Sequence, residues 1–465
     1  MLRFFRINDP YRLLAVLLVT ILMALPLLIN ALPMTWQELK WTILGETLHR
    51  GNTLYVFAWD DTAPFTAWIN KLLYSLWGRS ILGPRILSVV IIFFQVAFFS
   101  IVLINHKAYN ESTYLPAFVA SVLCFFSFDL LMFSPELLAS TFLLLSLRSI
   151  FKEIEFREQR EETGFNIGLY IGIASLFIFS YVIFIFGSFI ILLIFTRLSV
   201  RKALLLFFGF GFPHVLLSTY YYFQGNLDLL FQNFYSPNLH FGTTAFVTAK
   251  GFFLLGAIPV AYFFFSIVML NREAHFTKYQ SQVLQVMLLW LIIAFAQIVF
   301  TRERTPHSFY TFIPPLAYLI SHYLLLIRRK WIAELMLWTL LGGILTTSYL
   351  ERSGRIKDVP LHAFFPSLKS DPAISKKKIW VLGSDFLPFA ANTPAASFLN
   401  WTLAQPVFEQ PDLYQNVEAV EAAFRREAPD VIIDPNDYMN AFLKRIPAMR
   451  MVYKREGESY LKTSN

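Results

Sequence analysis

The chain has 465 residues, of which 56% are hydrophobic and only 15% are charged. A soluble domain carries roughly 25% charged residues, so this composition excludes an ordinary soluble protein and predicts extensive contact with a membrane.

The formal net charge is +8. The basic residues cluster at the ends of apolar segments, where they set membrane topology, so we expect no nucleic-acid partner. A single cysteine, Cys124, excludes a disulfide within the chain and a zinc site built from cysteines.

The first apolar segment follows Arg3, Arg6 and Arg12, a charge pattern that is similar to the start of a signal peptide. The apolar stretch covers residues 13–32, which is long enough to cross a bilayer, and no small-residue cleavage pattern follows it. We therefore predict a retained first membrane helix.

Apolar segments of roughly spanning length recur through the first 350 residues and predict about eleven membrane helices. They lie at residues 13–32, 86–105, 113–128, 131–149, 166–180, 182–197, 203–222, 248–270, 281–300, 309–327 and 331–349. With the N-terminus in the cytoplasm, nearly all cations near these segments fall on the inner side, and the short outer loops hold only Arg302 and Arg304. This orientation places the loop 33–84 and the tail 351–465 outside the membrane.

The tail has a different composition and predicts a small α/β domain. We expect strands at residues 379–383 and 431–434, helices at 395–408 and 417–428, and a hairpin within 449–462. The predicted organisation is thus a helical polytopic membrane domain, residues 1–350 with a large first outer loop at 33–84, followed by a small extracytoplasmic α/β domain, residues 351–465.

The first outer loop contains a polar stripe and an adjacent pair of acidic residues. Residues 35–51 have helical character, with a polar stripe formed by Glu38, Thr42, Glu46 and His49. Residues 64–77 predict an amphipathic helix that lies on the membrane surface. Between them stands the adjacent pair Asp60 and Asp61, which could be solvated charges, ligands of a divalent metal, or acid/base groups.

These features together resemble the first outer loop of GT-C class glycosyltransferases. The resemblance rests on an acidic residue shortly after the first membrane helix, a turn from Gly51 to Tyr55, an acidic pair before Pro64, and amphipathic loop helices. Two further segments are similar to that class, the stretch from Asp129 through Ser134-Pro135-Glu136, and the cluster from Arg302 to Tyr310 at the start of a late helix. The resemblance is nearest to uncharacterised membrane proteins of this class from Bacteroidetes-type bacteria.

The resemblance implies an enzyme of the bacterial inner membrane. Such an enzyme moves a sugar from a polyprenyl-phosphate donor to an envelope acceptor on the extracytoplasmic face, among membrane lipids and envelope protein partners. It implies catalytic roles for Glu38 as base and for Asp60 and Asp61 as second acid or metal ligand. Substrate contacts are expected from Arg302, Arg304 and His307 at the donor phosphate, and from Glu46, His49 and Glu136. The residues themselves fix no cofactor, although the acidic pair could hold a divalent metal.

Each of these roles has a structural alternative. Glu38 could pair with a nearby cation such as Lys40 or Arg304 on a helix surface, and the acidic pair could form a turn that caps the following helix. The segment 302–307 could be a charged interfacial loop, and Glu136 could complement a helix dipole. The class commonly has an Asp-Glu pair where this chain has Gln37-Glu38. The rival function is therefore a catalytically inactive scaffold subunit of an envelope complex that serves secretion, motility or glycan assembly.

Overall fold

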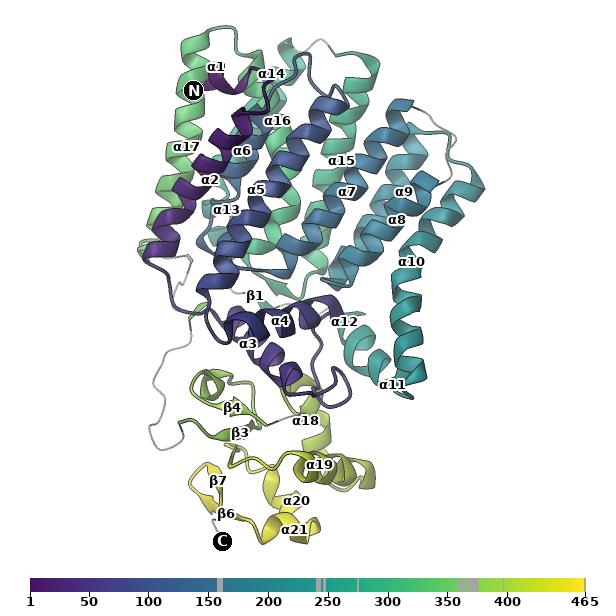
Figure 1. Cartoon of the computed structure of the whole chain (residues 1–465), viewed down its shortest axis with the longest axis vertical. Helices are drawn as coiled ribbons and strands as arrows, with labels where there is room; N and C mark the ends of the chain where they lie inside the picture. The colour runs from purple at the N-terminus through teal and green to yellow at the C-terminus, as the bar shows by residue number, and fades with distance from the viewer. Residues whose placement is uncertain are drawn as a thin grey trace. The chain divides into compact units, whose positions relative to one another are not determined.

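The computed structural model describes residues 1–156, 162–239, 244–245, 248–273, 276–356, 358–359, 364–365, 375–395 and 397–463. The chain divides into two compact units, which we describe separately (Figure 1). Unit 1 contains Met1–Leu32, Leu82–Leu217 and Phe241–Leu361, and unit 2 contains Pro33–Ile81, Ser218–His240 and His362–Asn465. The first outer loop and the tail thus belong to the same compact unit. The division into domains 1–350 and 351–465 that the sequence predicts stays a prediction.

Unit 1 is a helical bundle. Its helices are α1 (Leu2–Phe5), α2 (Arg12–Ile29), α5 (Leu82–Asn105), α6 (Leu115–Leu123), α7 (Pro135–Phe156), α8 (Glu162–Ser175), α9 (Ile183–Phe195), α10 (Val200–Phe223), α13 (Ala249–Leu255), α14 (Ala257–Glu273), α15 (Lys278–Phe300), α16 (Ile313–Leu326) and α17 (Lys330–Arg352). Short 3-10 turns η1 (Phe128–Leu131), η2 (Phe179–Val182) and η4 (Pro306–Phe312) precede α7, α9 and α16, and the strands β1 (Thr244–Ala245) and β2 (Glu303–Arg304) pair in parallel. The last residues of α10, from Ser218, belong to unit 2.

Six helical segments among the described residues are long and apolar enough to cross a bilayer. They are α2, α5, α10, α15, Pro306–Leu326 and α17, and α13 with α14, bent by 66° at their junction, could form a seventh. The expected count of about eleven is not confirmed. Two of the predicted segments contain only the 9-residue α6 and the 14-residue α8. Helices of that length rise about 14 to 21 Å, less than the roughly 30 Å of a bilayer core.

Glycines allow α8 to pack closely against α10. A Cβ atom on Gly168 would collide with the carbonyl oxygen of Leu206, and one on Gly172 would collide with that of Phe210. In the opposite direction, a Cβ on Gly209 would collide with the carbonyl oxygen of Phe165. Small residues four apart on a helix are the usual means by which membrane helices approach backbone to backbone.

Unit 2 contains the two helices of the first outer loop, α3 (Trp36–His49) and α4 (Pro64–Trp77), which lie side by side. Thr35 caps α3, and Pro64 occupies the first turn of α4, where its missing N–H costs nothing. The two helices touch at Gly45, since a Cβ there would collide with the carbonyl oxygen of Asn70. The segment after α10 adds α11 (Leu227–Leu230), the π-helical turn η3 (Phe231–Tyr235) and α12 (Ser236–Leu239).

The tail folds into a five-stranded sheet with the strand order β4-β3-β5-β7-β6. The parallel strands β4 (Thr393–Pro394), β3 (Lys378–Val381) and β5 (Val431–Ile433) stand beside the antiparallel hairpin of β6 (Tyr453–Glu456) and β7 (Ser459–Lys462). The remaining elements are η7 (Leu387–Ala390), α18 (Trp401–Glu409), α19 (Tyr414–Arg426), α20 (Met439–Arg445) and α21 (Pro447–Arg450). The strands β3 and β5 and the hairpin lie where the sequence predicted them, whereas β4 was not predicted. In contrast, α18 begins six residues later than predicted, because Asn400 caps it.

Candidate functional site

Glu38, the predicted base, takes part in a capping box at the start of α3. The Thr35 hydroxyl accepts a hydrogen bond from the Glu38 backbone N–H at 3.2 Å, and Glu38 Oε2 accepts one from the Thr35 backbone N–H at 2.9 Å. Glu38 is buried, and this reciprocal pair satisfies two backbone donors that the helix leaves unbonded. Structurally, then, Glu38 is a helix cap, and its catalytic role remains a prediction.

Asp60 and Asp61 stand at the end of a tightly bonded turn. The turn begins at Tyr55, a fully buried residue whose φ is +65°, a conformation that costs a side chain of this size energy. Three bonds hold the turn: Tyr55 Oη donates to the Thr62 carbonyl at 2.6 Å, Asn233 Nδ2 to the Tyr55 carbonyl at 2.7 Å, and Asn238 Nδ2 to the Asp61 carbonyl at 2.9 Å. The backbone that carries both carboxylates is therefore fixed before any ligand binds.

The two carboxylates have different surroundings. Asp60 is 2% exposed, and its Oδ1 accepts the Thr62 backbone N–H at 2.7 Å. Burial raises the pKa of Asp60, and the charge of Asp61 adds to this effect while Lys40 opposes it. Asp61 is partly exposed, and its Oδ1 lies 3.5 Å from Lys40 Nζ and 2.8 Å from Asn400 Nδ2. Asp60 is thus the more buried acid, held by the Thr62 backbone, and Asp61 has a cation and an amide donor beside it.

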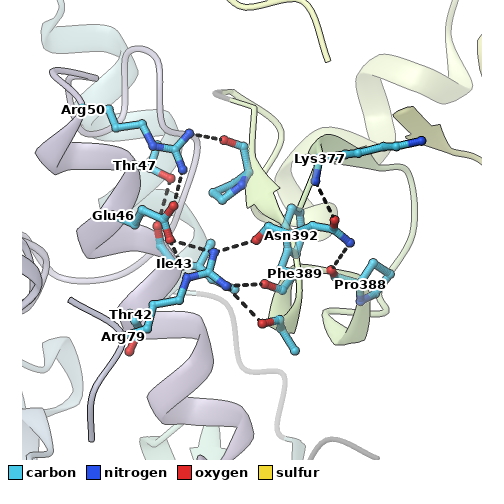
Figure 2. A network of polar contacts seen from close by, with 12 residues as sticks. Thr42, Ile43, Glu46, Thr47, Arg50, Arg79, Lys377, Pro388, Phe389 and Asn392 are labelled. Carbon is cyan, nitrogen blue, oxygen red and sulfur yellow. Dashed lines mark hydrogen bonds and ion pairs between the residues drawn. The ribbon is translucent and has the colours of Figure 1, made fainter. Parts of the chain in front are cut away.

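Glu46, a predicted substrate contact, joins the first outer loop to the C-terminal segment (Figure 2). Its carboxylate is buried and pairs with Arg50 and with Arg79, whose Nη2 lies 2.8 Å from Oε2. Arg79 also donates to the carbonyl oxygens of Phe389, Ala390 and Asn392 at 3.0, 3.1 and 2.6 Å. The two arginines therefore balance the negative charge of Glu46. The other member of the stripe, His49, is exposed, with its ring 5.5 Å from that of Tyr74.

The remaining predicted residues belong to unit 1. Arg302 and Arg304 are partly buried at the end of α15, and Arg304 lies in β2. Arg304 Nη2 donates to the Val299 carbonyl at 3.3 Å, whereas its Nε is buried and has no hydrogen-bond partner within the described part of the chain. An unbonded buried guanidinium N–H is costly, so a ligand that accepts it would be favoured there.

His307 opens η4 and lies in a buried polar cluster. Its backbone N–H and its Nδ1 lie 2.9 and 3.0 Å from Asp129 Oδ2, and its Nε2 lies 3.6 Å from Glu136 Oε2. Ser127 connects Asp129 to Glu351, with its Oγ 2.8 Å from Asp129 Oδ1 and 2.8 Å from Glu351 Oε1. This arrangement brings together His307 and Glu136, which the sequence analysis named. The cluster also contains Glu351, which the sequence did not single out. The feature that could have indicated it is a carboxylate at the end of an apolar helix.

The predicted residues thus form two groups, each within one unit. Unit 2 holds Glu38, Glu46, His49, Asp60 and Asp61, and unit 1 holds Glu136, Arg302, Arg304 and His307. Sequence reasoning missed Lys40 and Asn400 as the partners of Asp61. Among the described residues no group of three histidine, cysteine or acidic side chains could hold a metal ion, and the expected divalent metal stays a prediction.

Comparisons with known proteins bear on the fold. No family model and no curated protein matches the sequence. ArnT from Cupriavidus metallidurans, solved bound to undecaprenyl phosphate, matches with a TM-score of 0.56 and 12% identity over 96% of this chain and 97% of the ArnT chain. Its apo state gives 0.55 and 12% over the same shares. The oligosaccharyltransferase of Archaeoglobus fulgidus gives 0.41 and 13% identity, over 89% of this chain and 59% of that chain.

ArnT, which was solved with undecaprenyl phosphate bound, has a GT-C class fold. The match over nearly the whole of both chains shows that this protein is a membrane protein with a GT-C fold. The resemblance that the sequence indicated is confirmed at the level of the fold. The narrower likeness to proteins from Bacteroidetes-type bacteria stays a prediction.

Proposed function

We propose that the protein is an integral membrane glycosyltransferase that moves a sugar from a polyprenyl-phosphate donor to an envelope acceptor on the extracytoplasmic face of a bacterial inner membrane. The observation that supports this most is the fold shared with ArnT along both chains, since ArnT was solved with undecaprenyl phosphate bound. Fold alone does not determine activity. The proposal therefore also depends on chemistry carried by particular residues.

In this proposal Asp60 is the general base. The acceptor oxygen attacks the anomeric carbon of the sugar, a new carbon–oxygen bond forms, and the bond from that carbon to the phosphate oxygen breaks. The acceptor proton passes to the Asp60 carboxylate, and polyprenyl phosphate leaves with the bonding electrons. A base works best when its pKa lies near the working pH, and burial moves the pKa of Asp60 in that direction. The fixed turn from Tyr55 to Thr62 keeps the carboxylate in place without cost during the reaction.

Arg302 and Arg304 are the proposed partners of the donor phosphate. Two guanidinium groups near one end of α15 supply positive charge where the leaving phosphate gains negative charge. The buried, unbonded Nε of Arg304 supports this role, because a phosphate oxygen would satisfy it.

A scaffold without catalysis is the second candidate, and one observation favours it. Two of the predicted acids already have structural partners, since Glu38 caps α3 and Glu46 pairs with Arg50 and Arg79. A scaffold would need these carboxylates only for folding, and it would tolerate replacement of Asp60.

The experiment that separates the two candidates compares cells that produce the wild-type protein with cells that produce Asp60→Asn at the same level. Envelope lipids, glycans and glycoproteins are analysed by mass spectrometry. We expect the variant to lose one sugar-sized mass increment that the wild type adds, together with accumulation of an unused polyprenyl-phosphate sugar. An unchanged envelope, with the same proteins co-purifying, would favour the scaffold and contradict the transferase.

A further inference from the structure

The segment that carries the acidic pair is joined to the C-terminal segment by its backbone. The Trp59 N–H donates to the Ser397 carbonyl at 3.0 Å, and the Asn400 N–H donates to the Trp59 carbonyl at 3.1 Å. The Trp59 ring also packs edge-on against Phe398, with ring centroids 5.5 Å apart. Ser397 adopts a φ of +98°, which is unfavourable for any residue except glycine. The strained residue Ser397 is therefore hydrogen-bonded to Trp59, the residue that precedes the acidic pair.

The side chain of Asn400 makes two different hydrogen bonds. Its Oδ1 accepts the Thr402 backbone N–H at 3.0 Å and so caps α18, and its Nδ2 donates to Asp61 Oδ1 at 2.8 Å. The backbone N–H of Thr402 can only donate, so the oxygen of the amide must face Thr402 and the NH₂ group must face Asp61. Asn400 is 8% exposed, so water competes little with either bond.

Several described groups face the acidic pair, and Asn400 reaches it from the C-terminal segment. Lys40 reaches Asp61 from α3 at 3.5 Å, Asn238 binds the Asp61 carbonyl from α12, and the Thr62 N–H binds Asp60. Tyr55 donates to the Thr62 carbonyl behind the pair. The ammonium group of Lys40 sets no particular orientation of the Asp61 carboxylate, because it is a point charge on a flexible side chain. The planar amide of Asn400 is hydrogen-bonded through both its oxygen and its nitrogen, so it does set the orientation of the Asp61 carboxylate.

We propose that Asn400 is a positioning residue for Asp60 and Asp61, so that the C-terminal segment completes a carboxylate site carried by the first outer loop. The use of this site in sugar transfer rests on the function proposed above. The contact itself, and its effect on how the two acids hold protons, can be measured without any enzyme activity.

The test uses Asn400→Asp in the full-length protein. Aspartate caps a helix as well as asparagine does, so the bond from Thr402 is kept. The donor to Asp61 is lost, and a negative charge takes its place. Carbodiimides attack protonated carboxyl groups, so mass spectrometry of the peptide containing Asp60 and Asp61 after carbodiimide treatment, across a range of pH, reports protonation of the pair. We expect the pH of half-labelling to rise by about one unit, because a nearby like charge disfavours ionisation.

Arg426→Gln is the matched control. Arg426 also links the C-terminal segment to the first outer loop, with its guanidinium 3.4 Å from the Phe57 ring centroid and its Nε 3.2 Å from Asn52 Oδ1. It makes none of the described contacts with the acidic pair, so the labelling profile should stay at the wild-type position. A second variant, Asn400→Ser, keeps a capping side chain and removes the amide without adding charge. It should shift the profile in the same direction as Asn400→Asp, by less.

The inference is overturned if both Asn400 variants fold with wild-type thermal midpoints and show the wild-type labelling profile. It is also overturned if Arg426→Gln shifts the labelling profile as much as the Asn400 variants do. The shift would then come from a weaker contact between the C-terminal segment and the first outer loop. Binding of undecaprenyl phosphate to the same preparations is measured separately. Failure of the wild type to bind it would contradict the proposed function, whereas a labelling shift confined to the Asn400 variants would still support the position assigned to Asn400.

Discussion

Arg79 and Glu46 form an ion pair in which Nη2 of the arginine lies 2.8 Å from Oε2 of the glutamate, and the same guanidinium binds three carbonyl oxygens of the segment 389–392. A carboxylate that the sequence placed among the substrate contacts therefore holds the C-terminal segment to the first outer loop. The loop that bears Asp60 and Asp61 consequently belongs to the same folded unit as the tail.

Replacing Glu46 with glutamine should destabilise unit 2 by about 2 kcal/mol. The change removes the carboxylate that pairs with Arg79 and leaves Arg50 with only the more distant carboxylate of Glu427, 3.6 Å away. The measurement is hydrogen exchange of the segment 387–395, which should become faster. Glu421→Gln is the control, since Glu421 pairs with Arg425 on an exposed helix face and such pairs contribute less than about 1 kcal/mol. Equal effects of the two variants would contradict the assigned role of Glu46.

Asp60 should contribute a loss of stability to unit 2 as the pH rises. Burial raises the pKa of Asp60, so the folded state binds the proton more tightly than the unfolded state, whose aspartates titrate near about 3.9. The stabilisation is complete below the unfolded pKa and is lost as the pH rises through the raised folded pKa. In Asp60→Asn, the thermal midpoint should vary less with pH over that range. A variant profile parallel to the wild-type profile would show that Asp60 does not titrate differently on folding.

Arg304→Gln should weaken binding of undecaprenyl phosphate by about tenfold, since one charge-assisted hydrogen bond contributes about 1.5 kcal/mol or more. Binding is measured by native mass spectrometry in detergent. The affinity of the wild type should also drop more steeply with salt than that of the variant. Arg425→Gln, on an exposed face of α19, should leave binding unchanged. If both variants bind like the wild type, Arg304 is not a phosphate partner.

Ser397→Gly should raise the stability of unit 2 by about 1 kcal/mol, because glycine adopts a φ of +98° without strain. Thermal unfolding measures the effect. Asp437→Gly offers a contrast at another positive φ, +58°, where Asp437 also accepts a hydrogen bond from Tyr460 and pairs with Arg455 at 2.9 Å. We expect that variant to gain nothing or to lose stability. A loss of stability in Ser397→Gly would mean that the serine side chain contributes more than the strain costs.

Asp129→Asn should lower the thermal stability of unit 1 by about 2 kcal/mol. Asp129 Oδ2 faces both the backbone N–H and Nδ1 of His307, and Oδ1 accepts from Ser127, so an amide nitrogen must replace one acceptor in a buried site. Glu162→Gln, in the exposed first turn of α8 in the same unit, should change stability little. A wild-type thermal midpoint for Asp129→Asn would show that the cluster tolerates the lost acceptor.

The Thr35-x-x-Glu38 spacing shows how far local sequence reasoning reaches. That spacing is the signature of a capping box, and it predicts the role that Glu38 has in the structure. The roles predicted for Glu38 were a catalytic base and a surface ion pair, whereas in the structure it closes the capping box of α3. Here the information was present in four consecutive residues, because a cap bonds to its own helix.

The sequence by itself determined the membrane class, the strands of the tail and the presence of an acidic pair before α4, because hydropathy, alternation and helix signals depend on neighbouring residues. Tertiary structure alone decided which partners those residues have. Asp61 meets Asn400 across 339 positions, and Ser127 meets Glu351 across 224. Such pairs leave no pattern in a single sequence, since each depends on helices and strands that pack against one another only after the chain has folded.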